Sequence, residues 1–229
     1  KIYSRTATIL VKDSRKGGDT DLGAFSDLVG FQNRRNVDNE VYILQSHRLM
    51  SEVVKRLHLT VNYSVREGLR TADLYGRSPI EVDFINDNSK QKLSLEVTPL
   101  RNGKIELTDF EDKFVTRQET KRVILAEYGD TVATPVGQVV VHKTLFMDST
   151  YLKKPITVIK NSLAATTNAY RAAVKSDVAN KQASIVTISM NNSVPRRAED
   201  VINTLIAVYE EDAIADKRQL SVVTADFIK

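Results

Sequence analysis

The three histidines are the side chains best suited to metal binding or to proton transfer near neutral pH. They are His47, His58 and His142. A helical zinc site pairs two histidines four residues apart around a Glu, and other zinc sites cluster His with Cys. The three histidines fit neither spacing, and the chain has no Cys. We therefore interpret each as a surface or half-buried residue and predict no metal site.

Other patterns of catalytic or cofactor-binding residues are incomplete. Lys16-Gly17-Gly18-Asp19 lacks the second Gly followed by Lys and Ser/Thr that a phosphate-binding loop requires, so we predict a surface loop there. A Gly-x-Ser-x-Gly nucleophile motif is missing from the sequence. The carboxylates of Glu111-Asp112 and of Glu210-Glu211 are adjacent in sequence, so on regular elements they point apart. We predict no catalytic residue and no cofactor.

Two pairs of basic residues could meet a polyanion, because cationic side chains release counterions from a charged polymer. They are Lys153-Lys154 and Arg196-Arg197, the second at the start of a predicted helix, where cations oppose the helix dipole. An ordinary solvated surface is the alternative. The net charge of +4 and the aromatic content of 7% are both low, and the basic residues do not form one arm, so we predict no nucleic-acid partner.

The composition is that of an ordinary globular protein with one large or two small domains. Of the 229 residues, 41% are hydrophobic and 27% charged, which is enough apolar material to form a core without disulfides. No segment is apolar and long enough to cross a bilayer, and the start lacks a signal-peptide pattern. The chain begins with Lys1 rather than Met, so we expect a piece of a longer protein whose flanking membrane segments lie outside it.

Helical and strand periodicities divide the chain into a base and an insertion. Alternating or β-branched runs predict strands at Tyr3–Val11, Ile156–Lys160 and Ile185–Met190. Apolar spacing predicts a helix from Val37 to about His58, capped by Asn36 and burying Ile43, Met50, Val54 and Leu57. A second helix starts after Ser162 and carries Leu163, Thr167, Tyr170 and Val174. We expect a mobile loop at Asp13–Asp21 and a short apolar piece of one or two helical turns at Leu22–Phe31.

The last stretch, Ser193 to Lys229, predicts one long amphipathic helix. Pro195 suits its first turn, and Ala198, Ile202, Leu205, Tyr209 and Ala213 form an apolar line. A helix of this length spans roughly 50 Å at ~1.5 Å per residue, more than a compact domain of this size requires. It is either a core helix packed along its first half or the base of a stalk or oligomer contact.

Residues 60–144 differ in character, because Gly, Pro and Asn separate short alternating runs. Asn102-Gly103 predicts a hairpin turn, Thr134 to Gly137 another turn, and Asp109–Glu119 a charged loop. We therefore predict an α+β fold: a mixed sheet packed with long helices, plus an inserted antiparallel β meander. The base domain comprises residues 1–59 and 145–229, and the β-rich subdomain residues 60–144.

The order of these elements resembles the periplasmic Wzz domain of polysaccharide co-polymerases, the chain-length determinants, and especially the branch found in exopolysaccharide tyrosine autokinases. The likeness covers essentially the whole chain. It is carried by Tyr3–Leu10, Glu40–Ser46, Val53–Leu57, Thr134–Gly137, Pro195–Asn203, Tyr209 and Thr224–Ile228.

The resemblance implies a non-catalytic periplasmic domain of an inner-membrane protein, held between transmembrane helices. It implies a homo-oligomer that controls chain length and export of exopolysaccharide, capsule or the O-antigen of lipopolysaccharide. Its partners would be the polysaccharide polymerase, the export machinery and nascent polysaccharide. A cytoplasmic tyrosine kinase domain is fused in one branch, but no kinase signature occurs in this sequence.

Two other functions stay open from the residues alone. One is an envelope adaptor that binds a partner export protein through the β-rich subdomain. The other is a carbohydrate-active enzyme, which would need two carboxylates about 5 to 10 Å apart across a groove.

Overall fold

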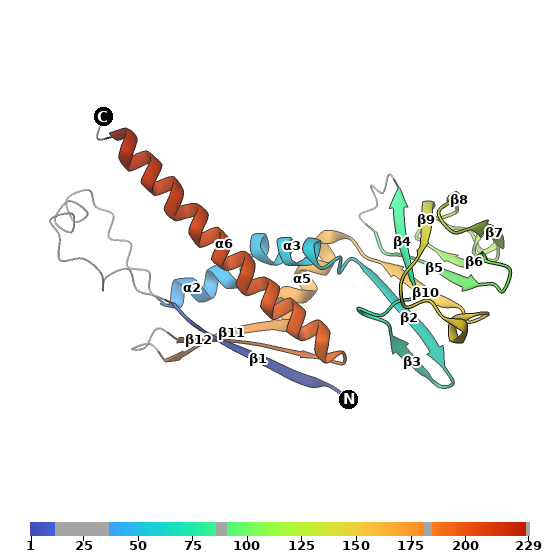
Figure 1. Ribbon diagram of the computed structural model, residues 1–229, viewed down its shortest axis with the longest axis horizontal. Helices are drawn as coiled ribbons and strands as arrows, with labels where there is room; N and C mark the ends of the chain where they lie inside the picture. The colour runs from blue at the N-terminus through green and yellow to red at the C-terminus, as the bar shows by residue number, and fades with distance from the viewer. Residues whose placement is uncertain (12–36, 86–90, 181–184, 228–229) are drawn as a thin grey trace. The chain divides into compact units, whose positions relative to one another are not determined.

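The computed structural model describes residues 1–11, 37–85, 91–180 and 185–227 (Figure 1). The predictions for Asn36, Asp13–Asp21 and Leu22–Phe31 lie outside the described residues. The chain forms two compact units. We call Lys1–Val53 with Asn168–Lys229 the terminal unit, and Val54–Thr167 the central unit.

The terminal unit contains a three-stranded antiparallel sheet. Its order is β1-β12-β11, with β1 at Tyr3–Leu10, β12 at Ile185–Asn192 and β11 at Val174–Asn180. The central strand β12 alternates regularly, and its residues Val186, Ile188 and Met190 are buried. The predicted strands at Tyr3 and Ile185 are thereby confirmed, whereas β11 had no predicted counterpart.

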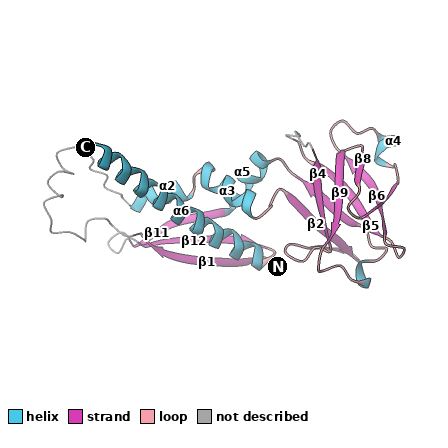
Figure 2. Ribbon diagram, turned by 45° about the horizontal axis from the view of Figure 1, so that its top comes forward, coloured by secondary structure: helices cyan, strands magenta, loops and turns pink. Residues whose placement is uncertain are grey.

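Helices cover one face of this sheet, as Figures 1 and 2 show. Helix α2 lies against β11 and β12, and α6 lies against β1 and β12. The helices other than the four-residue α4 are α2 (Val37–Leu44), α3 (His47–Arg56), α5 (Leu163–Ala173) and α6 (Pro195–Phe227).

The predicted single helix from Val37 to His58 is wrong, because it breaks at Gln45 and Ser46. The Leu49 N–H donates to Ser46 Oγ at 3.3 Å, so Ser46 caps the second helix. The break rotates the apolar face. Ile43 is 38% exposed and Leu57 half-buried, whereas Met50 and Val54 are buried as predicted.

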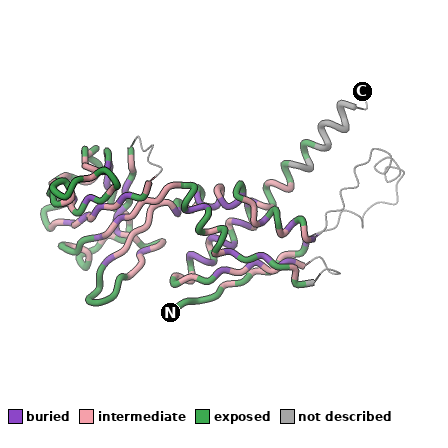
Figure 3. The backbone as a smooth tube through the Cα atoms, turned by 180° about the vertical axis from the view of Figure 1, so that it is seen from behind, coloured by how far each residue is buried: buried purple, intermediate pink, exposed green. Residues whose placement is uncertain are grey.

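Helix α6 agrees with its prediction. Its 33 residues start at Pro195, and the buried positions among its described side chains lie in the first half of the helix. Those apolar positions are Ala198, Val201, Ile202, Leu205 and Val208. Figure 3 shows these buried positions in the part of the helix that lies over the strands.

The central unit is a sandwich of two antiparallel sheets. The six-stranded sheet has the order β3-β2-β10-β5-β6-β7, and the three-stranded sheet has the order β4-β9-β8. The first contains β3 (Arg70–Asp73), β2 (Val61–Glu67), β10 (Ile156–Lys160), β5 (Leu93–Pro99), β6 (Lys104–Glu111) and β7 (Ile124–Glu127). The second contains β4 (Ile80–Ile85), β9 (Gly137–Lys143) and β8 (Thr131–Thr134).

The inner faces of both sheets share one apolar core. Leu95 and Val97 from the larger sheet and Val82 and Val141 from the smaller belong to the same buried cluster. The Val82 N–H donates to the Tyr63 hydroxyl at 2.9 Å, which joins the two sheets, and burial raises the pKa of Tyr63 to about 12.

The predicted α+β class, one mixed sheet packed with long helices, is wrong. The described residues are mostly β, with twelve strands in three antiparallel sheets, and α6 is the one long helix among them. The strand at Ile156 was expected beside those at Tyr3 and Ile185, yet β10 pairs with β2 and β5. Period-2 alternation identifies a strand, but it does not identify the distant strand that pairs with it.

The predicted single meander is also wrong, because the strands between residues 60 and 144 belong to two sheets and β4 pairs with the distant β9. The turns were predicted better. The loop at Asn102-Gly103 joins β5 to β6, with Gly103 at φ +80, and Thr134 and Gly137 flank the β8–β9 turn.

Asp109–Glu119 is not one loop, because β6 runs to Glu111 and Phe110 is fully buried. Two short turns, α4 (Arg117–Thr120) and η1 (Ser149–Tyr151), complete the unit. Within the described ranges, none of the helices combines the length and apolarity that a bilayer crossing requires.

Candidate functional site

The structure does not gather the three histidines. His47 is the first residue of α3, His58 follows that helix with φ +50, and His142 lies on β9. All three are exposed. His142 Nε2 lies 3.3 Å from Asp83 Oδ2 across the β4–β9 ladder, so the neighbour of this histidine is a single carboxylate.

The paired carboxylates also lie on open surface. Ser94 Oγ donates to Glu111 at 3.2 Å, and Asp112 accepts the Lys113 N–H at 2.6 Å. Glu210 is exposed on α6, and Lys16–Asp19 lies outside the described residues. In the part of the chain that the structure describes, no three His, Cys, Asp or Glu side chains form a metal-binding group.

A carboxylate cluster on the outer face of the six-stranded sheet is the most unusual arrangement of titratable groups. Glu96 pairs with Thr108, and Ser94 pairs with Glu111, so a bulge in β6 separates the two pairs. Asp109 occupies the bulge with φ +49. The sequence prediction missed this cluster because it treated Asp109–Glu119 as a loop, whereas the buried Phe110 continues the strand.

Burial is the main cause that raises the pKa of Glu96 above its ordinary value, and the nearby charges of Asp109 and Glu111 raise it further. The hydroxyl of Thr157 on β10 donates to Glu96 Oε1 at 3.2 Å and partly offsets this effect. The cluster therefore combines a carboxyl of raised pKa, two further acidic side chains and hydroxyls on one sheet face. Such a face can exchange hydrogen bonds with a hydroxyl-rich ligand.

This cluster differs from a glycosidase cleft. One shallow hollow among the described residues of the central unit is lined by Thr116, Gln118, Glu119 and Arg122 at the α4 turn. Its carboxylate, Glu119, accepts the Thr116 N–H at 2.9 Å and thereby closes a capping box, which lowers the pKa of Glu119. Its lining contains none of the three carboxylates of the cluster.

We expect Glu96→Gln to weaken the pH dependence of stability. Because the folded protein holds the Glu96 proton more tightly than the unfolded chain, the free energy of unfolding decreases as pH rises from the ordinary pKa of 4.5 through the raised one. Glutamine cannot ionise, so this decrease should be smaller in the variant. Urea denaturation between pH 4 and pH 7 measures it, with Glu67→Gln as an exposed control. Equal slopes for the native protein and Glu96→Gln would contradict the account.

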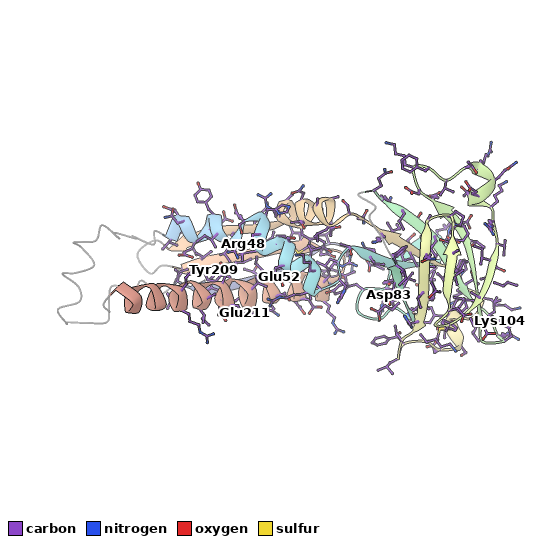
Figure 4. The ribbon with its side chains drawn as sticks, turned by 90° about the horizontal axis from the view of Figure 1, so that it is seen from above. Arg48, Glu52, Asp83, Lys104, Tyr209 and Glu211 are labelled. Carbon is purple, nitrogen blue, oxygen red and sulfur yellow. The ribbon has the colours of Figure 1, made fainter. Side chains whose placement is uncertain are left out.

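Polar contacts in the terminal unit hold α6 as far as Asp212, just past the midpoint of the helix. The Tyr209 hydroxyl donates to Glu40 Oε2 at 2.6 Å, and Glu40 is buried on α2. Arg48 on α3 forms a two-point ion pair with Asp212, which lowers the pKa of Asp212. In Figure 4, Arg48, Glu52, Tyr209 and Glu211 lie where the α3 and α6 ribbons run close together.

Two buried charged residues of the terminal unit were not recognised as buried from the sequence patterns. The sequence patterns gave no sign that Glu40 is buried, and they placed Arg197 in a solvated or polyanion-binding pair. Both are buried, at 1% and 8% exposure, whereas Arg196 is exposed and lies 3.8 Å from Asp200. Glu40 and Arg197 are charged residues among apolar ones on their helices, and this pattern could have indicated that each is buried.

No known family model matches this chain, and no curated protein matches it. The resemblance to the Wzz domain therefore rests on the sequence segments quoted in the sequence analysis alone.

Proposed function

We propose that this chain is a non-catalytic assembly module of surface-polysaccharide synthesis, the periplasmic Wzz-type domain of an inner-membrane polysaccharide co-polymerase. In this role, copies of the protein associate, and the assembly controls the length and export of an exopolysaccharide, capsule or O-antigen.

The observation that carries the proposal is the length of α6 relative to the sheet below it. The 33 residues of the helix span about 50 Å at ~1.5 Å per residue. The eight-residue strands β1 and β12 span about 26 Å at ~3.3 Å per residue. A helix that only completed this small core would need about half of that length.

The burial pattern agrees with this difference in length. Val208 is the last buried residue of α6 among those whose side chains are described, and Glu210, Ile214 and Arg218 beyond it are exposed. Ile214 is an apolar side chain beyond the last buried position described, and it remains 51% exposed. An apolar residue on a projecting helix supports a role in packing against another copy.

The segments that resemble the Wzz domain form the main elements of the terminal unit, and this supports the proposed family. Tyr3–Leu10 forms the edge strand β1, Glu40–Ser46 forms most of α2 and the break after it, and Pro195–Asn203 begins α6. In the terminal unit, the first strand pairs with the strand that directly precedes the long helix. The central unit is thus an insertion between the two halves of one unit.

Light scattering of the full-length parent protein in detergent tests the assembly. We expect a defined multimer for the native protein and a lower mass for Ile214→Asp. Ala207→Asp is the matched control, since Ala207 is an exposed α6 residue over the sheet, and it should keep the native mass. A native protein that stays monomeric across concentrations would refute the proposal.

A further inference from the structure

The end of the central unit at which β10 begins carries exposed apolar and basic side chains together. Ile156, the first residue of β10, pairs with Val65 on one side and Val97 on the other. Because these ladders are antiparallel, β2 and β5 end where β10 starts. We call residues 66–70, 100–104 and 144–155 the basic end.

Backbone hydrogen bonds hold the segment before β10 beside the end of β5 and close the β5–β6 turn. The Lys153 N–H donates to the Pro99 carbonyl at 2.8 Å, and the Leu100 N–H donates to the Lys104 carbonyl at 2.9 Å. In Figure 1 the β2–β3 turn and the η1 turn lie at the same end of β2 and β10. In Figure 4 the labelled Lys104 lies at that end.

Three apolar side chains of the basic end are exposed at turns. Leu69 and Leu145 are fully exposed, at 101% and 102%, and Phe146 is 51% exposed. Gly68, with φ +62, occupies the first position of a two-residue hairpin loop and places Leu69 at its tip. The apolar side chains are therefore divided between two separate turns and do not form one flat patch.

Basic residues surround these tips. The three segments contain six basic residues and two acidic ones. The basic residues are Arg66, Arg70, Arg101, Lys104, Lys153 and Lys154, and the acidic ones are Glu67 and Asp148. Glu127 lies 3.6 Å from Lys104 and offsets one further charge, so the balance is 6 − 3 = +3. Asp148 is engaged as the cap of η1, where the Thr150 N–H donates to it at 2.7 Å.

We propose that the basic end docks on an anionic phospholipid surface. Leu69, Leu145 and Phe146 enter the boundary between headgroups and acyl chains, and the Arg and Lys side chains face the phosphates. Lipid fits better than a soluble polyanion because the exposed apolar side chains would stay in water on a polyanion, whereas a lipid surface buries them. It fits better than a protein groove because a groove binds a contiguous face. The inference concerns the central unit and does not depend on the proposed function.

Tryptophan fluorescence gives a direct test, since the chain contains no Trp. In the Leu69→Trp variant the only indole lies at the tip, and Leu125→Trp is the control, because Leu125 is exposed in the middle of β7. Phosphatidylcholine vesicles that contain phosphatidylglycerol should shift the Leu69→Trp emission to shorter wavelength and leave the Leu125→Trp emission unchanged. An unshifted Leu69→Trp emission would overturn the proposal.

Vesicle sedimentation separates the two contributions to binding. Leu69→Ser with Leu145→Ser and Phe146→Ser should reduce binding at least tenfold, whereas Leu125→Ser should not. The double variant Lys153→Gln, Lys154→Gln should reduce vesicle binding by a further tenfold or more, because each charge contributes about fivefold. The control is the double variant Lys113→Gln, Lys121→Gln, which removes two charges beside α4 and should leave vesicle binding unchanged.

A soluble polyanion provides the remaining outcome. If dextran sulfate binds the native chain with the same charge dependence, and the serine variants still bind vesicles normally, then the basic end is a polyanion site and the lipid proposal is wrong. Vesicle binding that requires both the apolar and the basic residues would support it.

Discussion

Phe110→Ala is expected to destabilise the central unit by about 3–5 kcal/mol, the range for a large aromatic removed from a core. Phe110 is fully buried in the cluster that both sheets share. Its ring reaches the core because the β6 bulge at Asp109 returns the following residue to the inner face. Removal of the ring leaves a cavity that neighbouring strands can fill only partly.

Phe114→Ala is the matched control, since it removes the same side chain four residues later from a position that is 76% exposed. Urea denaturation followed by circular dichroism should give a native-like midpoint for Phe114→Ala and a much lower one for Phe110→Ala. Equal midpoints for the two variants would mean that the β6 register described above is wrong.

Leu205→Ala has the second largest expected effect, a loss of about 2–5 kcal/mol in the free energy of unfolding of the terminal unit. Leu205 is fully buried where α6 lies against β1 and β12. The helix depends on this apolar stripe, because the second half of α6 contributes no buried residue among those with described side chains. Hydrogen exchange should show faster exchange in α6 and β12.

Asn203→Ala provides the control on the same helix, because Asn203 is exposed and its replacement removes no core contact. Its free energy of unfolding should stay within about 1 kcal/mol of the native value. If Leu205→Ala were equally mild, α6 would not be anchored by its apolar stripe.

Local patterns predicted the elements well and their pairing poorly. The alternation in β1 and β12 and the long apolar stripe of α6 are signals within one segment, so they were found. The pairing of β10 with β2 and β5 depends on residues 59 to 99 positions away, and no local pattern contains that information. The break at Ser46 was missed because the apolar spacing continues through it.

Strand β11 shows a second limit. Val174 was taken as the last apolar residue of a helix, but the helix ends at Ala173 and Val174 starts a strand. An edge strand with Lys175 and Asp177 on alternate positions is too polar to be distinguished from a helix surface. Tertiary pairing with β12 decides its conformation.

The carboxylate cluster was predictable only in part. Glu96 lies within an alternating strand, so its outward orientation could have been inferred. Its neighbours Asp109 and Glu111 reach the same face through a bulge, and a bulge changes the register without a clear sequence signal. The buried pair of Glu40 and Tyr209 likewise joins α2 to α6 across 169 residues.

The length distribution of the surface polysaccharide in cells tests the central claim most directly. Cells with the native full-length protein should produce polymer of a defined modal length. Cells with Ile214→Asp at the same protein level should lose that mode, and cells with Ala207→Asp should keep it. An unchanged length distribution in cells that lack the protein altogether would contradict the account.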